Sequence, residues 1–448
     1  MKTKSIILVS VIIILLIVPV FWILLQDSSN PQNESNEPNE SNEPAPILWQ
    51  RDIENFATGL AADGGNVYTI DIFGNIKSYY TSSGNSVWNG SIGGYFSKGV
   101  LSYKDKVYGG SGNAIVGCLD KTTGRKLWDL AGTRGIKYGK QAPENFTVVD
   151  DRLYIKTNTF SVFNAMTGKF LWMINEFGPI PGQSNNIYGI NAWAFDDDLI
   201  IATSGSPEGK YIYRLNPDDG TINWTVDGMF SGTPVIYQGQ AILQNQTGHN
   251  IFSLNVTSGE ILWSYDIEAE IFSPIEYNGL LLFVASNDCF YALNLDTVTL
   301  EWKTNVASQN ITSLVNSDNP LEALPIIIDE QNQRMIGCLA VTTQTITDDI
   351  HVEDHHYGIL CNLDIETGNI IWTEYFSGDG NISNKYLVFD YASSENYIYM
   401  TAINDLLIFS KKTGNLIEAK HYEHQVTPPV AGNGKVYVAA DLWLFAYD

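Results

Sequence analysis

A short phrase recurs along this chain: a turn ending in glycine is followed, after three intervening residues, by tryptophan. Complete copies run over residues 84–88, 124–128, 168–172, 220–224, 259–263 and 368–372. Two copies are altered, with Val298 in place of the glycine before Trp302 and Glu418 in place of the tryptophan after Gly414. Internal repetition with a period of about 40 residues is typical of repeat architectures, so the phrase strongly constrains the fold.

Each repeat contains four short runs of strand-forming residues separated by turns, as residues 232–263 illustrate. No stretch between Trp49 and the C-terminus has sustained helical periodicity. Four antiparallel strands per repeat, arranged radially, form a blade of a β-propeller. The sequence therefore predicts an all-β propeller.

The glycine and the tryptophan of the phrase have structural explanations. Glycine suits a tight turn that needs positive φ. A large ring at one fixed place in every repeat is expected to pack between neighbouring blades, rather than to form platforms for a sugar or a flat cofactor. The tryptophans concerned are Trp49, Trp88, Trp128, Trp172, Trp224, Trp263, Trp302 and Trp372.

The ends of the chain suggest how the ring closes. Complete repeats end at residues 88, 128, 172, 224, 263, 302, 372 and 418, and the tail then offers three more strands near 428–431, 435–440 and 442–447. The segment around Trp49 has the pattern of a missing outer strand. We expect this N-terminal strand to complete the C-terminal blade, which removes an exposed sheet edge. The count then gives nine blades.

The turn phrase also carries a family resemblance. The segments 119–128 (LDKTTGRKLW) and 363–372 (LDIETGNIIW) resemble the PQQ-like, quinoprotein-type propeller repeat, and the likeness extends from Trp49 to Asp448. This resemblance implies eight blades, the usual number, so eight and nine both stay open. The family includes calcium- and PQQ-dependent alcohol dehydrogenases as well as non-catalytic members. The dehydrogenases commonly carry two adjacent cysteines, which this chain lacks, so the resemblance favours a non-catalytic, surface-anchored member.

Residues 1–26 are predicted to form a membrane anchor. Residues 6–25 are almost wholly apolar, long enough to span a bilayer, and preceded by Lys2 and Lys4. This orientation places the rest of the chain outside the cytoplasm as a single-pass membrane protein; a cleaved signal peptide is the alternative. Residues 27–46, rich in Asn, Glu, Ser and Pro, are typical of a disordered tether before the propeller at 47–448. Asn33 and Asn39 in this tether are candidate glycosylation sites.

The net charge of −25 argues against a nucleic-acid partner, because phosphate neutralisation needs clustered Lys and Arg. The four cysteines are too few for a disulfide framework. Cys338 and Cys361 are expected on adjacent strands of one repeat, where they either pair or stay as buried free thiols.

Loop lengths indicate where a site would lie. Connections from the first to the second strand and from the third to the fourth are short almost throughout. Long segments at 173–190, 204–209, 303–323 and 343–354 all belong to the other face of the disc. Because variable loops on a rigid scaffold carry function, we expect the site on this long-loop face, around the central channel.

One stretch on that face has ligands for a divalent metal: His351, Asp354, His355 and His356. The alternative is a solvated polar loop without a specific role.

Three functional hypotheses follow. The leading one is a membrane-anchored extracytoplasmic propeller that binds a protein or a surface glycan as a scaffold, without a cofactor. The second is an oxidoreductase dependent on PQQ with calcium, or on a divalent metal. The third is a structural component of a cell-surface layer. Fold alone does not decide among them.

Overall fold

The computed structural model describes residues 45–95, 99–111, 115–130, 146–156, 159–175, 190–196, 199–204, 211–227, 230–245, 250–267, 269–306, 321–346, 352–380, 389–402 and 404–448. The chain divides into two compact units, Met1–Glu43 and Pro44–Asp448. The predicted anchor and tether, with Asn33 and Asn39, lie outside the described residues. Within the described ranges, no helix has the length and apolar character needed to cross a membrane.

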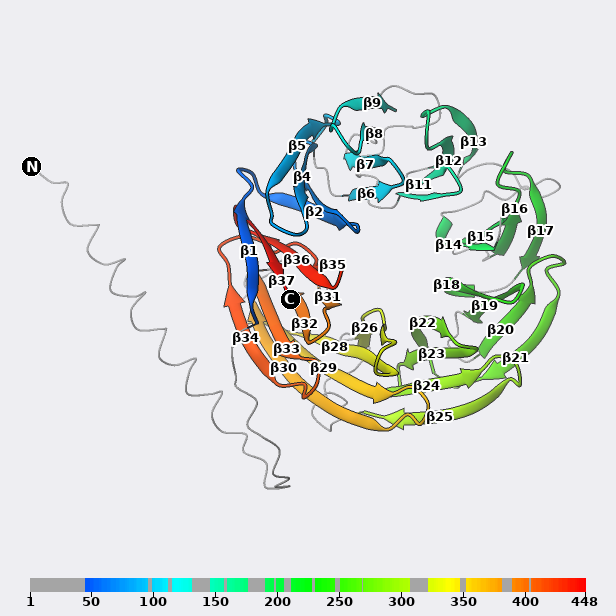
Figure 1. The fold of residues 1–448 in the computed structure, drawn as a ribbon. Coiled ribbons are helices and arrows are strands. Elements are labelled where there is room, and N and C mark those ends of the chain that lie inside the picture. Colours follow the sequence, from blue (N-terminus) through cyan, green and yellow to red (C-terminus); the bar gives the residue numbers. More distant parts are fainter. Residues whose placement is uncertain are drawn as a thin grey trace, which may run out of the picture. The chain divides into compact units, whose positions relative to one another are not determined.

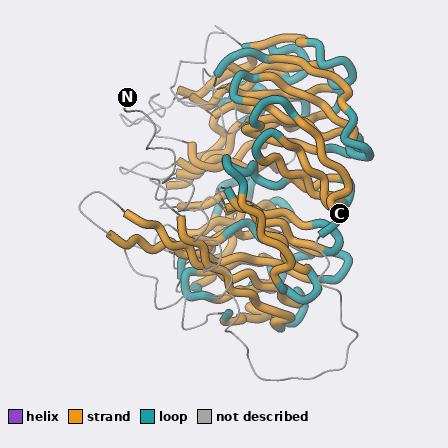
Figure 2. Tube along the Cα trace, turned by 90° about the vertical axis from the view of Figure 1, so that its left-hand side faces the viewer, coloured by secondary structure: helices purple, strands orange, loops and turns teal. Residues whose placement is uncertain are grey.

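The described part of Pro44–Asp448 is built from strands alone, and no segment of it is coloured as helix in Figure 2. The first sheet is β2 (Ala57–Ala62), β3 (Asn66–Asp71), β4 (Asn75–Tyr80) and β5 (Ser86–Ser91). The second is β6 (Gly99–Tyr103), β7 (Lys106–Ser111), β8 (Ile115–Asp120) and β9 (Lys126–Asp129). The third is β10 (Phe146–Val149), β11 (Arg152–Lys156), β12 (Thr159–Asn164) and β13 (Phe170–Asn175).

The next three sheets repeat the same order. The fourth is β14 (Ile190–Asp196), β15 (Leu199–Ser204), β16 (Tyr211–Leu215) and β17 (Ile222–Asp227). The fifth is β18 (Phe230–Tyr237), β19 (Gln240–Asn245), β20 (Asn250–Asn255) and β21 (Ile261–Asp266). The sixth is β22 (Ile271–Tyr277), β23 (Leu280–Ala285), β24 (Cys289–Asn294) and β25 (Thr299–Asn305).

The last three sheets vary the pattern. The seventh divides its first strand into β26 (Leu321–Ala323) and β27 (Ile327–Asp329), followed by β28 (Arg334–Ile346), β29 (Val352–Asp364) and β30 (Ile370–Gly380). The eighth is β31 (Phe389–Ser393), β32 (Tyr397–Ala402), β33 (Asp405–Ser410) and β34 (Leu416–His421). The ninth joins β35 (Val430–Gly432), β36 (Lys435–Ala440) and β37 (Trp443–Tyr447) to β1 (Ile47–Asp52).

In Figure 1 these sheets follow one another around a common centre, with the first strand of each innermost. All strand pairs of the described residues are antiparallel, so the predicted all-β class with four-stranded antiparallel sheets is confirmed. The N-terminal strand occupies the expected place, since Gln50 of β1 lies opposite Phe445 of β37.

The apolar core lies between the sheets. The described residues form nine buried clusters, and each cluster joins two consecutive sheets. Tyr68 of the first sheet packs with Leu119 of the second, and Tyr437 of the ninth packs with Val67 of the first. Strands buried on both faces have near-continuous apolar runs, which explains why the middle strands show little alternation.

The repeated tryptophans link each sheet to the next. The indole Nε1 of Trp88 donates a hydrogen bond to the carbonyl oxygen of Lys121 (2.8 Å), in the turn before the fourth strand of the next sheet. Trp49, Trp128, Trp172, Trp224, Trp302 and Trp372 make the corresponding bond to Thr81, Met166, Pro217, Val256, Ile365 and Lys411. The glycine of that turn lies against the ring: a Cβ on Gly124 would lie 2.5 Å from the Trp88 side chain.

The two altered copies of the phrase interrupt this link. Val298 takes the place of the turn glycine with φ of 55°, and Trp263 instead donates to the side chain of Gln240 in its own sheet (2.9 Å). Glu418 takes the place of a tryptophan in the eighth sheet. A tryptophan at position 418 would have no turn to contact in the ninth sheet. The third and fourth strands of that sheet, β37 and β1, are not joined by a turn, because β1 comes from the N-terminal end of the chain.

One sequence-based expectation needs correction. The predicted loop at 343–354 is wrong: β28 continues to Ile346 and β29 begins at Val352. Its β-branched Thr and Ile residues favour strand, and Figure 2 shows a strand pair that extends beyond the others. Much of the other long segments, at residues 176–189, 205–210 and 307–320, lies outside the described residues.

The cysteine alternative is also resolved, because all four cysteines are free and buried. Cys361 lies opposite Gly337, one residue from Cys338. Successive residues of a strand face opposite sides of the sheet. Cys361 therefore packs toward the sixth sheet and Cys338 toward the eighth.

Candidate functional site

The innermost strands of three consecutive sheets are each interrupted by a proline. The sequences are Thr233-Pro234 in β18, Ser273-Pro274 in β22 and Leu324-Pro325 between β26 and β27. Proline lacks an N–H group, so it is tolerated at a sheet edge or at a bulge. The pairing register shifts between Ser231 and Val235 in β18, and between Phe272 and Ile275 in β22.

These irregularities move the inner strands out of a regular ladder. Gly232 has φ of 81° and Ser273 has φ of 47°, so the backbone at both bulges is in the left-handed region. Such conformations of a non-glycine residue are strained and are often found at functional sites. The two bulges leave room between the fifth and sixth sheets.

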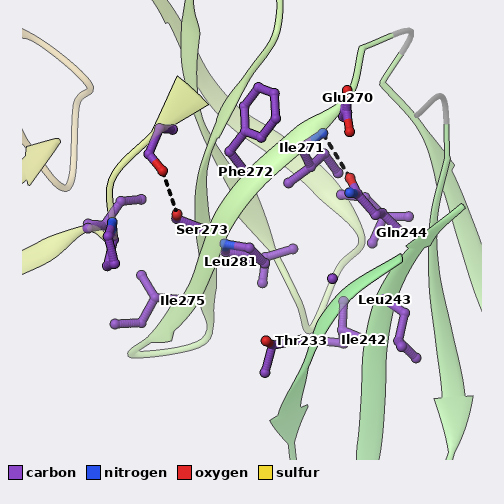
Figure 3. A pocket seen from close by; sticks show the side chains of 16 residues that line it. Thr233, Ile242, Leu243, Gln244, Glu270, Ile271, Phe272, Ser273, Ile275 and Leu281 are labelled. Atoms are coloured by element: carbon purple, nitrogen blue, oxygen red, sulfur yellow. Dashed lines mark hydrogen bonds between the residues drawn. The ribbon is translucent and has the colours of Figure 1, made fainter. Parts of the chain in front are cut away.

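A cavity of about 590 Å³ occupies this space and reaches the start of the seventh sheet. We call it the apolar pocket. Its buried wall is formed by Ile242, Ile251, Ile271 and Leu281. Figure 3 shows the side chains of Thr233, Gln244 and Ser273 around the same space. The volume is within the range of small-molecule and side-chain binding pockets.

Hydrogen bonds hold the pocket walls together across three sheets. The side-chain oxygen Oε1 of Gln244 accepts a bond from the backbone N–H of Ile271 (2.8 Å), and Ser273 Oγ donates to the carbonyl of Ala323 (3.4 Å) (Figure 3). Glu270 is exposed at the rim, where its backbone N–H donates to Ser286 Oγ (3.0 Å).

The pocket lies at the end of the sheets where we expected a site. Its lining comes from the starts of β18 and β22, the end of β19 and the start of β20. Blade-to-blade connections and connections from the second to the third strand leave the sheets at this end.

The described lining of the pocket is mostly apolar. Glu270 is the one ionisable side chain among the described residues that line the pocket. Burial raises the pKa of the Cys118 thiol to about 12 and also raises the pKa values of Cys289, Cys338 and Cys361. A thiol with so high a pKa stays protonated and unreactive at neutral pH.

The sequence-predicted metal ligands are only partly placed. His351 lies outside the described residues. Asp354, His355 and His356 belong to β29, where they lie opposite Gln344, Thr343 and Thr342, and only their backbone is described. Across the part of the chain that the structure describes, no three His, Cys, Asp or Glu side chains converge to hold a metal ion. The metal site stays a prediction.

Sequence reasoning missed the apolar pocket. A signal for it was present, since proline stands near the start of the first strand in three successive repeats. The pattern indicates interrupted inner edges, but only the sheet register shows that the bulges face a common space.

Known proteins resemble this chain along most of its length. A family model described as "Outer membrane protein assembly factor BamB" matches residues 44–176, 112–270 and 208–448. The outer membrane protein assembly factor BamB of Yersinia pestis is 22% identical over 291 residues, which cover 61% of this chain and 65% of that protein. A tetrathionate hydrolase of Acidithiobacillus ferrooxidans is 21% identical over 331 residues, covering 67% and 63%. The chain thus spans just under two thirds of the length of these two relatives.

Among solved structures, a quinohemoprotein alcohol dehydrogenase from Pseudomonas putida HK5 is similar, with a TM-score of 0.51 and 13% identity. The match covers 92% of this chain and 77% of that chain. At this identity the likeness shows the fold alone.

Proposed function

Because the chain belongs to the family of the outer membrane protein assembly factor BamB, we propose that it is a non-catalytic, protein-binding β-propeller. The observation that carries this proposal is the apolar pocket, which opens beside the inner strands at the long-loop end of the sheets. A partner would insert an apolar side chain between the fifth and sixth sheets. A buried apolar anchor in a formed pocket is the usual centre of a protein interface.

The proposed ring has nine blades and is closed by β1. Support comes from the nine inter-sheet clusters of the described residues, one of which joins the ninth sheet to the first. Lys435 of the ninth sheet also donates to the carbonyl of Thr81 in the first (3.3 Å). A closed ring gives a rigid platform, which lowers the entropic cost of ordering the pocket on binding.

We further propose that residues 1–26 anchor this ring to a membrane and that residues 27–46 tether it on the extracytoplasmic side. The support is the apolar run at 6–25 with lysines on one flank only, together with the acidic, low-complexity segment that follows. Proteinase accessibility of the ring in intact cells tests the orientation.

Site-specific photo-crosslinking tests the binding role. A photoreactive residue is placed at Thr233, at the mouth of the pocket, and for comparison at Ser258, an exposed residue in the turn of the same sheet at the opposite end of the strands. We expect Thr233 to yield one defined protein adduct that Ser258 does not yield. The adduct should disappear when Glu270→Arg or Ser273→Phe alters the pocket. Equal adducts from both positions would contradict the proposal.

A dehydrogenase-like role remains testable because of the fold shared with the Pseudomonas putida enzyme. In that class PQQ is held together with calcium, and the described residues show no convergent set of acidic or histidine ligands for such an ion. We therefore assign no residue to PQQ. Native mass spectrometry of the chain with added PQQ and calcium tests this role. A stoichiometric PQQ adduct would favour an oxidoreductase over the proposed binding role.

A further inference from the structure

A second cavity, of about 430 Å³, lies between the seventh and eighth sheets. We call it the polar pocket. It is formed at the turns that join first to second and third to fourth strands, so it lies at the opposite end of the sheets from the apolar pocket. Four carboxamide side chains line it: Gln331, Asn332, Asn362 and Asn396. This site is independent of the proposed protein-binding role.

Two ion pairs lie in or beside the polar pocket. Lys411 Nζ lies 3.0 Å from Asp329 Oδ2, and both side chains are nearly buried, at 11% and 7% exposed. Asn332 Nδ2 donates to the same oxygen (3.0 Å). Arg334 at the wall is paired with Asp364. These pairs neutralise the charges of Lys411, Asp329 and Arg334, and the other two charged residues of the lining, Glu395 and Lys412, are of opposite sign.

Asn362, which lines the pocket, has one buried polar atom without a partner in the described part of the chain. Asn362 is only 3% exposed, and its Nδ2 donates to the carbonyl of Lys411 (3.3 Å). Its Oδ1 has no hydrogen-bond partner among the described residues. A buried acceptor without a donor is destabilising. A ligand that donates a hydrogen bond to this oxygen would remove that cost.

The interface between the first and second sheets offers a comparison for this pocket. Their interface has the same ion pair, between Asp63 and Lys121 (2.8 Å), and the same indole bond, from Trp88 to the Lys121 carbonyl. There the ring of Tyr68 packs beside Trp88, and its hydroxyl donates to Asp63 Oδ2 (2.9 Å).

The seventh sheet lacks this tyrosine. Tyr68 lies opposite Ser78, which lies opposite Trp88. By the same register Ile336 lies opposite Asn362, which lies opposite Trp372. Tyrosine also stands at this register position in four other sheets, as Tyr108, Tyr154, Tyr399 and Tyr437, whereas the fourth, fifth and sixth sheets have the aliphatic residues Ile201, Ile242 and Leu282. An isoleucine has neither the ring nor the hydroxyl with which Tyr68 contacts Trp88 and Asp63 in the first sheet.

We propose that the polar pocket binds a small, neutral, polyhydroxylated ligand of the saccharide class. Hydroxyl groups donate and accept hydrogen bonds at once, as do the carboxamides that line the pocket. One ligand hydroxyl would donate to Asn362 Oδ1, and others would meet Asn332 and Asn396 at the mouth. Ile371, 44% exposed at the wall, offers an apolar surface for the C–H face of a sugar ring.

The test uses the full-length chain and saturation-transfer NMR with glucose, galactose and N-acetylglucosamine, with inorganic phosphate as the charged comparison. We expect one sugar to bind at one site per chain and phosphate to bind weakly or not at all. Three substitutions should each weaken this sugar about tenfold or more, the size of one lost hydrogen bond or more. They are Asn362→Ser, which installs the residue of the first sheet; Asn396→Ala at the mouth; and Ile336→Tyr, which fills the pocket.

Gln238→Ala is the matched control, because it removes a carboxamide from the equivalent turn of the fifth sheet, remote from this pocket. It should leave sugar binding unchanged. If Ile336→Tyr fails to fold, Asn362→Ser and the exposed Asn396→Ala decide the question. The proposal is overturned if none of the three sugars binds the wild-type chain, if the variants bind the sugar as the wild type does, or if phosphate binds instead.

Discussion

The contact between each turn glycine and the preceding tryptophan predicts a large effect from a single methyl group. Gly124 has φ of 69°, and a Cβ there would lie 2.5 Å from the ring of Trp88. Gly434 has nearly the same φ, 72°, but a Cβ there would meet nothing within 4 Å. The two glycines therefore separate the backbone cost of alanine from the cost of the contact.

The magnitudes follow from these two terms. Alanine in the left-handed region costs roughly 1–2 kcal/mol, which is the whole expected loss for Gly434→Ala. Gly124→Ala should lose about 1–3 kcal/mol more, because the ring or the backbone must move to relieve the overlap. The measurement is the free energy of unfolding from urea titration followed by tryptophan fluorescence, with the m-value checked for unchanged cooperativity.

A background variant isolates the ring contact. In Trp88→Ala the extra cost of Gly124→Ala should vanish, so that Gly124→Ala and Gly434→Ala become equally destabilising. Equal losses for the two glycine variants in the wild-type background would refute the reasoning. Such a result would mean that the glycines are required by their φ values alone. It would also mean that the tryptophan ring can pack against a turn residue that carries a Cβ.

Four further predictions concern other parts of the chain. Val298→Gly should raise the free energy of unfolding by about 1 kcal/mol or more, because a β-branched residue is strained at φ of 55°; a lower urea midpoint would contradict this. Burial alone would raise the pKa of Asp329, but hydrogen bonds from Asn332 and Lys411 and the charge of Lys411 lower it below its ordinary value. Its stabilising contribution is therefore complete above the unfolded pKa of about 4 and is lost as the pH falls through the lower folded-state pKa. Unfolding measured between pH 6 and pH 2, at about one-unit steps, should show a shallower loss of stability in Asp329→Asn. The four buried thiols should not react with a thiol reagent at pH about 8 until the protein is denatured, and rapid labelling of the native chain would be inconsistent with their burial. If the seventh sheet holds a divalent metal, zinc binding measured by calorimetry should fall in His355→Ala and His356→Ala, and unchanged binding would remove these two as ligands.

Much of the fold could be predicted from local sequence patterns. The Gly-to-Trp phrase, the four strand-like runs and the isolated Trp49 are short-range features, and each depends on residues within one repeat. They led to antiparallel four-stranded sheets and to the pairing of the N-terminal strand with the last sheet, because turn chemistry and strand pattern are set by neighbouring residues.

The two pockets could not be predicted from local sequence patterns. Ile336 looks like an ordinary core residue in the sequence, and its importance comes from standing where five other sheets have tyrosine. Asp329 and Lys411 meet across two sheets although 82 residues separate them in the chain. The apolar pocket likewise needs bulges from two sheets and a wall from a third.

The sequence alone determined the repeat, the strand pattern within it and the tryptophan that marks each outer strand, because these depend on chemistry a few residues apart. Only the tertiary structure decided which side chains share a space. Sheet register and the stacking of successive sheets set that arrangement, and a one-residue offset is enough to turn Cys338 and Cys361 to opposite faces.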